Sequence, residues 1–148
     1  MDNKYGIYQA IVTNIQDPEK RGRIRVVCPD VMGDAESAWC EPVSPVAYDG
    51  GGDICVPALE EAVWVMFIGG DVERPVYLGG WWSESSTPFG DTYSDAENTR
   101  VVSFDKVNIR FTQEGLLIYI DGTLICKISS EGIDVTGDLN VDGDIHHN

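Results

Sequence analysis

The chain has 148 residues, 43% of them apolar, and 25 acidic against 10 basic side chains give it a formal charge of −15. This length suits one ordinary domain, or a compact domain with an appendage, and the apolar share excludes a disordered chain. The negative charge would repel a phosphate backbone over most of the surface, so nucleic acid is excluded as the expected partner.

The start of the chain, MDNKYGIYQA, lacks the basic residues and the apolar run of a signal peptide. No stretch of the sequence approaches the roughly 18 apolar residues of a membrane-spanning helix. We therefore expect the chain to be made in the cytoplasm without a signal peptide.

The four cysteines form no CxxC pair, and their spacing matches no common metal-ligand pattern. They are Cys28, Cys40, Cys55 and Cys126. We expect buried free thiols that pack as small hydrophobic side chains, with a disulfide or redox role as the alternative.

The first half of the chain has the pattern of short β-strands separated by turns. Strands are expected over residues 5–15, 21–29, 62–70 and 74–82. A looser segment lies between the second and third of these runs, and no long stretch shows an apolar helical period. Several short strands with Gly and Pro between them predict a small barrel, such as an OB-fold.

The second half begins with a change in composition. Residues 83–98 consist mainly of turn formers and acids with little to bury, which predicts a linker. Apolar and polar side chains then alternate along the residues 107–111, 116–128 and 133–145, and turn residues reset the alternation between these runs.

The alternating runs predict long strands that associate with other copies of the chain. Strands of about 12 to 15 residues would be roughly 40 to 50 Å long, beyond the reach of a small barrel. A closed prism of several chains would cover their apolar face and remove exposed sheet edges. Gly137 and Gly143 fit a shaft in which backbones crowd a common axis; the alternative is that both glycines form turns at strand ends.

Three stretches of the first half resemble a known family. They are GRIRVVCPD, AWCEPVSPVA and GGGDICVPALEEAVWVMFIGGDVERPVYLGGWW. Over roughly residues 5–82 the chain resembles the OB-fold domain of the phage baseplate assembly protein V and VgrG family, the central spike of contractile injection machines. The match is most specific in the closing pair, Val63–Trp82. Glu60 stands where the family has a glycine before its acid, and we expect this difference to alter only a turn.

The resemblance implies an all-β chain with an OB-fold domain at 1–82, a linker at 83–98 and an intertwined trimeric β-helix or β-prism spike at 99–148. It also implies a homotrimeric needle that stands on a tail hub or baseplate protein, assembled into a virion tail or injection particle. Such a needle helps to breach the envelope of a target cell, and a separate tip-capping protein is a further expected partner.

The acidic residues of the last run fit the outside of such a needle. Three chains would together carry 3 × −15 = −45 charges, which keeps a long needle soluble. The outward carboxylates would be Asp134, Asp138, Asp142 and Asp144. Calcium binding is the alternative role for these acids, but the spacing of a calcium-binding loop is absent.

No enzyme is expected. Both histidines lie at the end of the chain, so the barrel can hold no Ser–His or Cys–His pair, and no segment is long enough for a domain that cuts peptidoglycan. The basic cluster Lys20, Arg21, Arg23 and Arg25 is expected to be a solvated turn or a contact with an acidic hub surface. Of Trp81 and Trp82, adjacent on a strand, one is expected in the core and the other at a subunit contact.

The last feature is the histidine pair, His146 and His147. If the alternation of 133–145 continues, His147 faces the axis and His146 faces solvent, so three chains would form a candidate site for one iron or zinc ion. Related spikes hold iron with a His-x-His pair, and Ile145 stands where the first of that pair would fall. The alternative is a frayed chain end or a docking surface for a tip protein.

The leading hypothesis is therefore a non-enzymatic central spike. The alternative is an OB-fold binding module for a protein or glycan ligand, with a β-ribbon tail that serves only for oligomerisation. The oligomeric state of the purified protein tests the spike hypothesis, and truncation after Trp82 separates the two: trimerisation should be lost or much weakened for a spike, whereas a self-sufficient binding barrel should keep its ligand affinity.

Overall fold

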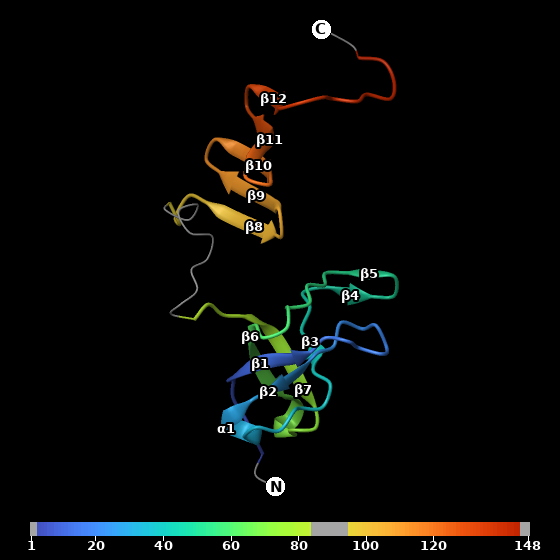
Figure 1. The fold of residues 1–148 in the computed structure, drawn as a ribbon, viewed down its shortest axis with the longest axis vertical. Helices are drawn as coiled ribbons and strands as arrows, with labels where there is room; N and C mark the ends of the chain where they lie inside the picture. The colour runs from blue at the N-terminus through green and yellow to red at the C-terminus, as the bar shows by residue number, and fades with distance from the viewer. Residues whose placement is uncertain (1–2, 84–94, 146–148) are drawn as a thin grey trace. The chain divides into compact units, whose positions relative to one another are not determined.

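The computed structural model describes residues 3–83 and 95–145, which divide into two compact units (Figure 1). Unit 1 comprises Met1–Ser86 and unit 2 comprises Thr87–Asn148. Both units are built mainly of β-strands, as predicted. Most of the predicted linker, residues 84–94, lies outside the described residues, and the domain limits at 82 and 98 stay predictions.

Unit 1 is a curled sheet of five strands with the order β2-β1-β6-β7-β3. Its elements are β1 (Tyr8–Asn14), β2 (Arg25–Val27), α1 (Pro29–Met32), β3 (Glu41–Pro42), β4 (Ala47–Tyr48), β5 (Gly51–Gly52), β6 (Ala62–Phe67), η1 (Ile68–Gly70) and β7 (Pro75–Gly80). β3 and β7 are parallel, whereas the other neighbours are antiparallel. An isolated bridge between Ile24 and Cys40 draws the two edges together, so the sheet forms an OB-like half-barrel.

The four strands predicted in the first half are confirmed as β1, β2, β6 and β7. Their inward side chains form the core, because alternate residues of a strand point to one face. The core consists of Ala10, Val12, Ile24, Val26, Cys28, Cys40, Val63, Val65, Phe67 and Tyr77. The alternation in β2 is confirmed, since Ile24 and Val26 are fully buried.

The cysteine prediction is confirmed for two of the four residues. Cys28 and Cys40 are buried free thiols in the core of unit 1. Cys55 is also a free thiol but is exposed, so the expectation of burial is wrong for it. Cys126 is half-buried in unit 2.

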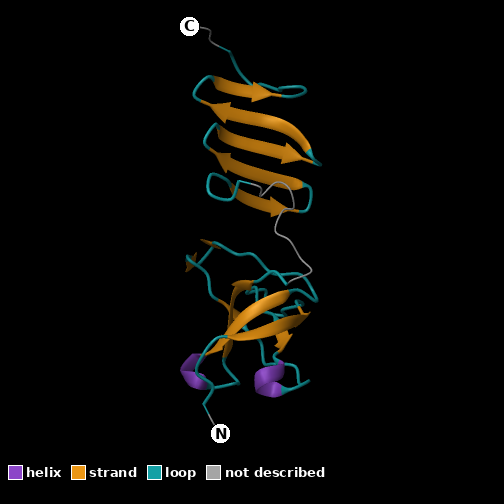
Figure 2. Cartoon of the chain, turned by 90° about the vertical axis from the view of Figure 1, so that its left-hand side faces the viewer, coloured by secondary structure: helices purple, strands orange, loops and turns teal. Residues whose placement is uncertain are grey.

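Unit 2 is a single antiparallel meander in which each strand pairs with the next (Figure 2). Its strands are β8 (Arg100–Phe104), β9 (Val107–Thr112), β10 (Gly115–Ile120), β11 (Thr123–Ser129) and β12 (Gly132–Val135). Two-residue turns join the strands at 105–106, 113–114, 121–122 and 130–131. The predicted breaks in the alternation at 113–115 and 129–132 are confirmed as turns.

The prediction of one long strand over 116–128 is wrong. This run is the hairpin β10–β11, which turns at Asp121 and Gly122, and both turn residues have positive φ, 50° and 78°. An Asp-Gly pair with these dihedral angles forms the tight turn that matches the twist of a hairpin.

The alternation survived this turn for a geometric reason. Paired residues of an antiparallel ladder lie on the same face of the sheet. Because the turn pairs Ile120 with Thr123, the face that carries the even-numbered residues of β10 carries an odd-numbered residue at the start of β11. A bulge before Cys126 then inserts one extra residue into β11, so that the even-numbered residues after it lie on the first face again. The even positions Cys126 and Ile128 therefore return to the face of Ile120.

The prediction of one strand over 133–145 is also wrong. β12 ends at Val135, and the strands of unit 2 are four to seven residues long, not 12 to 15. Gly137 and Gly143 have φ of 103° and 135°, in the region that favours glycine, and both lie in bends beyond the end of β12. The described residues after Val135 form no further strand, so the pair of hairpins that the turn alternative expected does not form there either. The intertwined trimeric β-helix stays a prediction.

Candidate assembly surfaces

The sheet of unit 2 has one face that is apolar nearly throughout. The register of the four strand pairs places twelve apolar side chains on it. We call this set the apolar face: Val102, Phe104, Val107, Ile109, Phe111, Leu116, Ile118, Ile120, Cys126, Ile128, Ile133 and Val135. The sequence alternation had already indicated most of these residues, because each strand has its apolar side chains at every second position.

Within the described residues of unit 2, no second layer covers the apolar face. Between residues 95 and 145 no side chain is buried. Phe104 is 80% exposed, Ile133 66% and Val102 61%. Ribbons of this kind need a further layer for stability, because their apolar side chains otherwise stay in water.

The opposite face of the same sheet is mixed in character. It includes Arg110, Tyr119, Lys127 and Asp134, interspersed with Val101 and Leu117. The Arg110 guanidinium lies 4.0 Å from the centre of the Tyr119 ring, and its Nε donates to the side-chain oxygen of Asn108 at 2.7 Å. These polar contacts suit a face that stays in contact with water.

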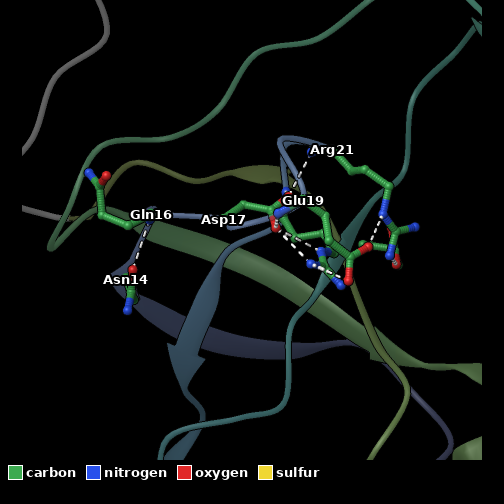
Figure 3. Close-up of polar contacts among 7 residues, drawn as sticks. Asn14, Gln16, Asp17, Glu19 and Arg21 are labelled. Carbon is green, nitrogen blue, oxygen red and sulfur yellow. Dashed lines mark hydrogen bonds and ion pairs between the residues drawn. The ribbon is translucent and has the colours of Figure 1, made fainter.

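In unit 1 the predicted basic cluster is organised by Asp17 (Figure 3). The Arg23 guanidinium donates to Asp17 Oδ1 through Nη2 at 2.7 Å and through Nε at 3.0 Å. The backbone N–H groups of Glu19, Arg21 and Arg23 donate to the same carboxylate. The bonded guanidinium, supported by these N–H groups, holds the pKa of Asp17 well below its ordinary value.

The expectation of a solvated basic turn is therefore wrong for Arg23, whereas Lys20 and Arg21 are exposed as expected. The alternative, a contact with an acidic hub surface, stays a prediction. The Arg23 side chain is 9% exposed and that of Asp17 is 5% exposed. Arg21 pairs with Glu19 and Glu41, and Arg25 pairs with Glu36. Acidic residues of unit 1 therefore neutralise these arginines. The guanidinium groups of Arg23 and Arg25 also lie over the Trp39 ring, 5.5 and 4.8 Å from its centre.

A groove of about 410 Å³ lies between the loop that contains Lys20 and Arg21 and the β4–β5 hairpin. Apolar side chains of the hairpin region line it, among them Val46, Tyr48 and Ile54, which are 54%, 68% and 63% exposed. Ser44 fixes the base of the hairpin, since its hydroxyl lies within hydrogen-bond distance of the carbonyl oxygens of Val46 and Asp53 at 2.7 and 2.6 Å. Figure 1 shows the hairpin at the end of unit 1 opposite to α1.

The groove was missed in the sequence. The signal was the pattern of apolar residues within the glycine-rich loop VSPVAYDGGGDICV, residues 43–56, because loops are usually polar at exposed positions. Such a groove can accept an apolar side chain or a short segment of another molecule.

The tryptophan prediction is wrong in part. Trp81 does not enter the core but lies half-buried against Trp64, with ring centres 6.0 Å apart. Trp64 alternates along β6 with the core residues Val63 and Val65, so it lies on the outer face of the half-barrel. Trp82 is 61% exposed, and its place at a subunit contact stays a prediction.

The thiols of the core are unsuited to nucleophilic chemistry. Burial raises the pKa of Cys40 to about 11 and also raises that of Cys28. Because the thiolate is the reactive form, these side chains stay protonated and inert at neutral pH. Their role in unit 1 is to fill the core.

The predicted metal ligands His146 and His147 lie outside the described residues. Within 3–83 and 95–145, no three His, Cys, Asp or Glu side chains are grouped so as to hold a metal ion. In the same part of the chain no helix is long and apolar enough to cross a membrane.

The curled five-stranded sheet of unit 1 coincides with a known domain. The family model of the type VI secretion system/phage-baseplate injector OB domain matches residues 8–82, from the first residue of β1 to just beyond β7. The match covers half of the chain, and the chain belongs to this family. The resemblance identified in the sequence is thereby confirmed. A search among curated proteins finds no match to this chain.

Proposed function

We propose that the protein is the central spike of a contractile tail or injection system. In this proposal unit 1 is the OB-fold domain and unit 2 forms the homotrimeric shaft and its apex. The N-terminal end stands on a tail hub or baseplate protein, and the opposite end helps to pierce the envelope of the target cell. The protein is assembled into a virion tail or injection particle.

One observation carries the proposal. A chain that belongs to the baseplate injector family continues into a sheet with one apolar face and no buried residue between 95 and 145. A monomer gains nothing from such a sheet, because a single layer leaves its apolar side chains in water. Association of several copies supplies the missing layer, and a needle on a baseplate is an assembly that needs it.

A structural role fits the chemistry of the chain better than catalysis does. The only histidines, His146 and His147, directly precede the last residue of the sequence. The thiols of Cys28 and Cys40 stay protonated because of burial. The groups that nucleophilic catalysis needs are therefore not brought together in unit 1. We propose no catalytic residues.

Light scattering on the purified full chain tests the proposal. We expect a mass three times that of one chain, and we expect a fragment truncated after Trp82 to be monomeric and folded, because unit 1 has its own core. A full chain that stays a monomer at micromolar concentration would overturn the spike function.

The groove beside the β4–β5 hairpin supports the second candidate function, a binding module for a protein or glycan ligand. In that case unit 2 would serve only for oligomerisation. The fragment truncated after Trp82 would then retain full ligand affinity, whereas the spike function requires the whole assembled chain.

We also propose that His146 and His147 hold one iron or zinc ion per trimer, or else contact a tip-capping protein. Imidazole nitrogens are common ligands of both metals. Elemental analysis of protein prepared without a histidine tag should give about one ion per three chains, and His147→Ala should remove it. Metal-free wild type, or unchanged metal in the variant, would contradict the metal site and leave a frayed chain end or the capping contact as the alternatives.

A further inference from the structure

The groove beside the β4–β5 hairpin has an ordered aromatic wall. Tyr48 and Gly51 are cross-strand partners in the hairpin, and the Tyr48 ring lies over Gly51, where a Cβ atom would collide with it. The same ring is 68% exposed. The hairpin therefore holds the ring in place while most of it meets solvent.

The other wall of the groove, the loop that contains Lys20, is also tied to the body of unit 1. The hydroxyl of the core residue Tyr77 donates to the carbonyl oxygen of Gly22 at 2.7 Å. A Cβ atom at Gly22 would collide with Ile54, so this loop packs closely against the segment that follows β5. Walls that are already ordered can receive a ligand without the cost of ordering them on binding.

Two polar groups of the groove have no protein partner. Lys20 and Asp53 both line it, and within residues 3–83 and 95–145 no hydrogen bond or ion pair engages the ammonium group of the one or the carboxylate of the other. Arg21, by contrast, pairs with Glu19 and Glu41, each at 2.9 Å. The groove thus offers one donor group and one acceptor group beside its apolar side chains.

These features select among classes of ligand. An anionic ligand is disfavoured, because Asp53 stands in the groove and acids already neutralise Arg21. An extended peptide finds few main-chain partners, since β4 and β5 have only two residues each. A sugar suits every part of the groove, because its ring has an apolar face that can stack on an aromatic side chain and its hydroxyls both donate and accept hydrogen bonds.

We propose that this groove binds an oligosaccharide of N-acetylated sugars. One ring stacks on Tyr48, and its hydroxyls form hydrogen bonds with Lys20 and Asp53. The acetyl methyl group supplies an apolar partner for the exposed side chains of Val46 and Ile54, which a plain sugar would leave in water. The inference rests on the binding function proposed for this groove and names its class of ligand, and it does not depend on the spike function.

Isothermal titration calorimetry on the full chain with two matched sugars tests the inference. Chitotetraose and cellotetraose have the same length and linkage, but only chitotetraose carries acetamido groups. We expect chitotetraose to bind with a Kd of about 1 mM or lower, and cellotetraose to bind about tenfold more weakly because it lacks the methyl groups. No binding of chitotetraose at about 10 mM, or equal affinity for the two sugars, would overturn the inference.

Variants of two exposed tyrosines show whether the sugar binds in the groove. Tyr48→Ala should weaken chitotetraose binding about tenfold or more, whereas Tyr48→Phe keeps the ring and should retain the affinity. Tyr5→Ala is the matched control, since Tyr5 is 70% exposed in unit 1 but does not line the groove, and it should bind as the wild type does. Unchanged affinity of Tyr48→Ala would overturn the inference.

Light scattering on the same samples separates this inference from the spike function. Tyr48→Ala should keep the mass of the wild type, because the groove belongs to unit 1 and the apolar face belongs to unit 2. A trimer with no affinity for chitotetraose would overturn the inference and leave the spike function intact. A monomer that binds chitotetraose through Tyr48 would support the inference and overturn the spike function.

Discussion

At the scale of single residues, Asp17 orders the loop that joins β1 to β2. Its carboxylate accepts from the Arg23 guanidinium and from three backbone N–H groups within the next six residues. A buried charged pair contributes to stability only when the remaining donors and acceptors are satisfied, and here the loop backbone satisfies them. One side chain therefore fixes the loop and neutralises a buried arginine.

The ion pair predicts a specific loss of stability in acid. Because the pKa of Asp17 is lowered on folding, its contribution is fully present above the unfolded value of about 3.9 and is lost as the pH falls below it. We expect Asp17→Asn to lower the free energy of unfolding at pH 7, and the difference from wild type to shrink as the pH falls from about 4 to 2. Urea unfolding at several pH values, followed by tryptophan fluorescence, measures it.

Glu19→Gln is the control for this prediction. Glu19 contacts Arg21 and Arg23, but its side chain is 58% exposed, so solvent screens these pairs. Its substitution should cost little at any pH. A difference between wild type and Asp17→Asn that does not change with pH would contradict the proposed role of the carboxylate.

The backbone of Glu60 has a conformation that glycine adopts more easily than glutamate. It has φ of 66°, in the left-handed region that favours glycine. This conformation destabilises the folded state by about 1–2 kcal/mol for an L-residue. Glycine avoids that strain, but it loses more conformational freedom on folding, which offsets part of the gain. We expect Glu60→Gly to raise the free energy of unfolding by about 0.5–1 kcal/mol in urea titrations. Glu61→Gly, where φ is not positive, should not stabilise.

At the scale of elements, unit 2 is specified by its turns. Two-residue connections recur about every eight residues, and positive φ occurs at Asp105 and Asp121 in two of them. Glycines follow the other two turns, at 115 and 132. The spacing of turns sets strand length and register together, so the same pattern of alternation yields short paired strands here.

The two glycines after the turns predict different responses to alanine. Gly115 and Gly132 have nearly the same φ, 140° and 139°, so an added Cβ strains the backbone equally at both. At Gly115 the Cβ would also collide with the carbonyl oxygen of Ile128, whereas at Gly132 it meets open space. We expect Gly115→Ala to lower the free energy of unfolding of unit 2 by about 1–3 kcal/mol more than Gly132→Ala. Equal losses in thermal unfolding would contradict this.

At the scale of the whole molecule, two kinds of unit are joined in one acidic chain. Unit 1 has a buried core, whereas unit 2 has an apolar face and no buried residue in its described part. The large negative charge opposes the contact between copies that the proposed assembly requires. Assembly should therefore depend on the balance between apolar burial and charge repulsion.

This balance predicts that salt strengthens assembly. Raising the ionic strength from about 10 mM to about 150 mM shortens the Debye length from roughly 30 to 8 Å, which screens repulsion between chains of charge −15. We expect the concentration of half-dissociation, measured by sedimentation over a dilution series, to fall with salt. A contact built on ion pairs would weaken instead, and that result would contradict an apolar interface.

The sequence by itself determined the class of the fold and the composition of its surfaces. The strands β1, β2, β6 and β7, the inward positions Ile24 and Val26, and most residues of the apolar face followed from alternation alone. They did so because successive side chains of a strand point to opposite faces whatever the strand pairs with. The family of residues 8–82 also followed, since its closing strand pair is a local pattern.

Only the tertiary structure decided what depends on pairing between distant positions. Alternation continues across a two-residue turn when a bulge compensates, so the sequence could not distinguish one long strand over 116–128 from the hairpin β10–β11. It could not show that Asp17 buries Arg23, or that the hairpin β4–β5 forms a groove with the loop of Lys20. These contacts join residues whose types are common at any surface, and only the folded backbone brings them together.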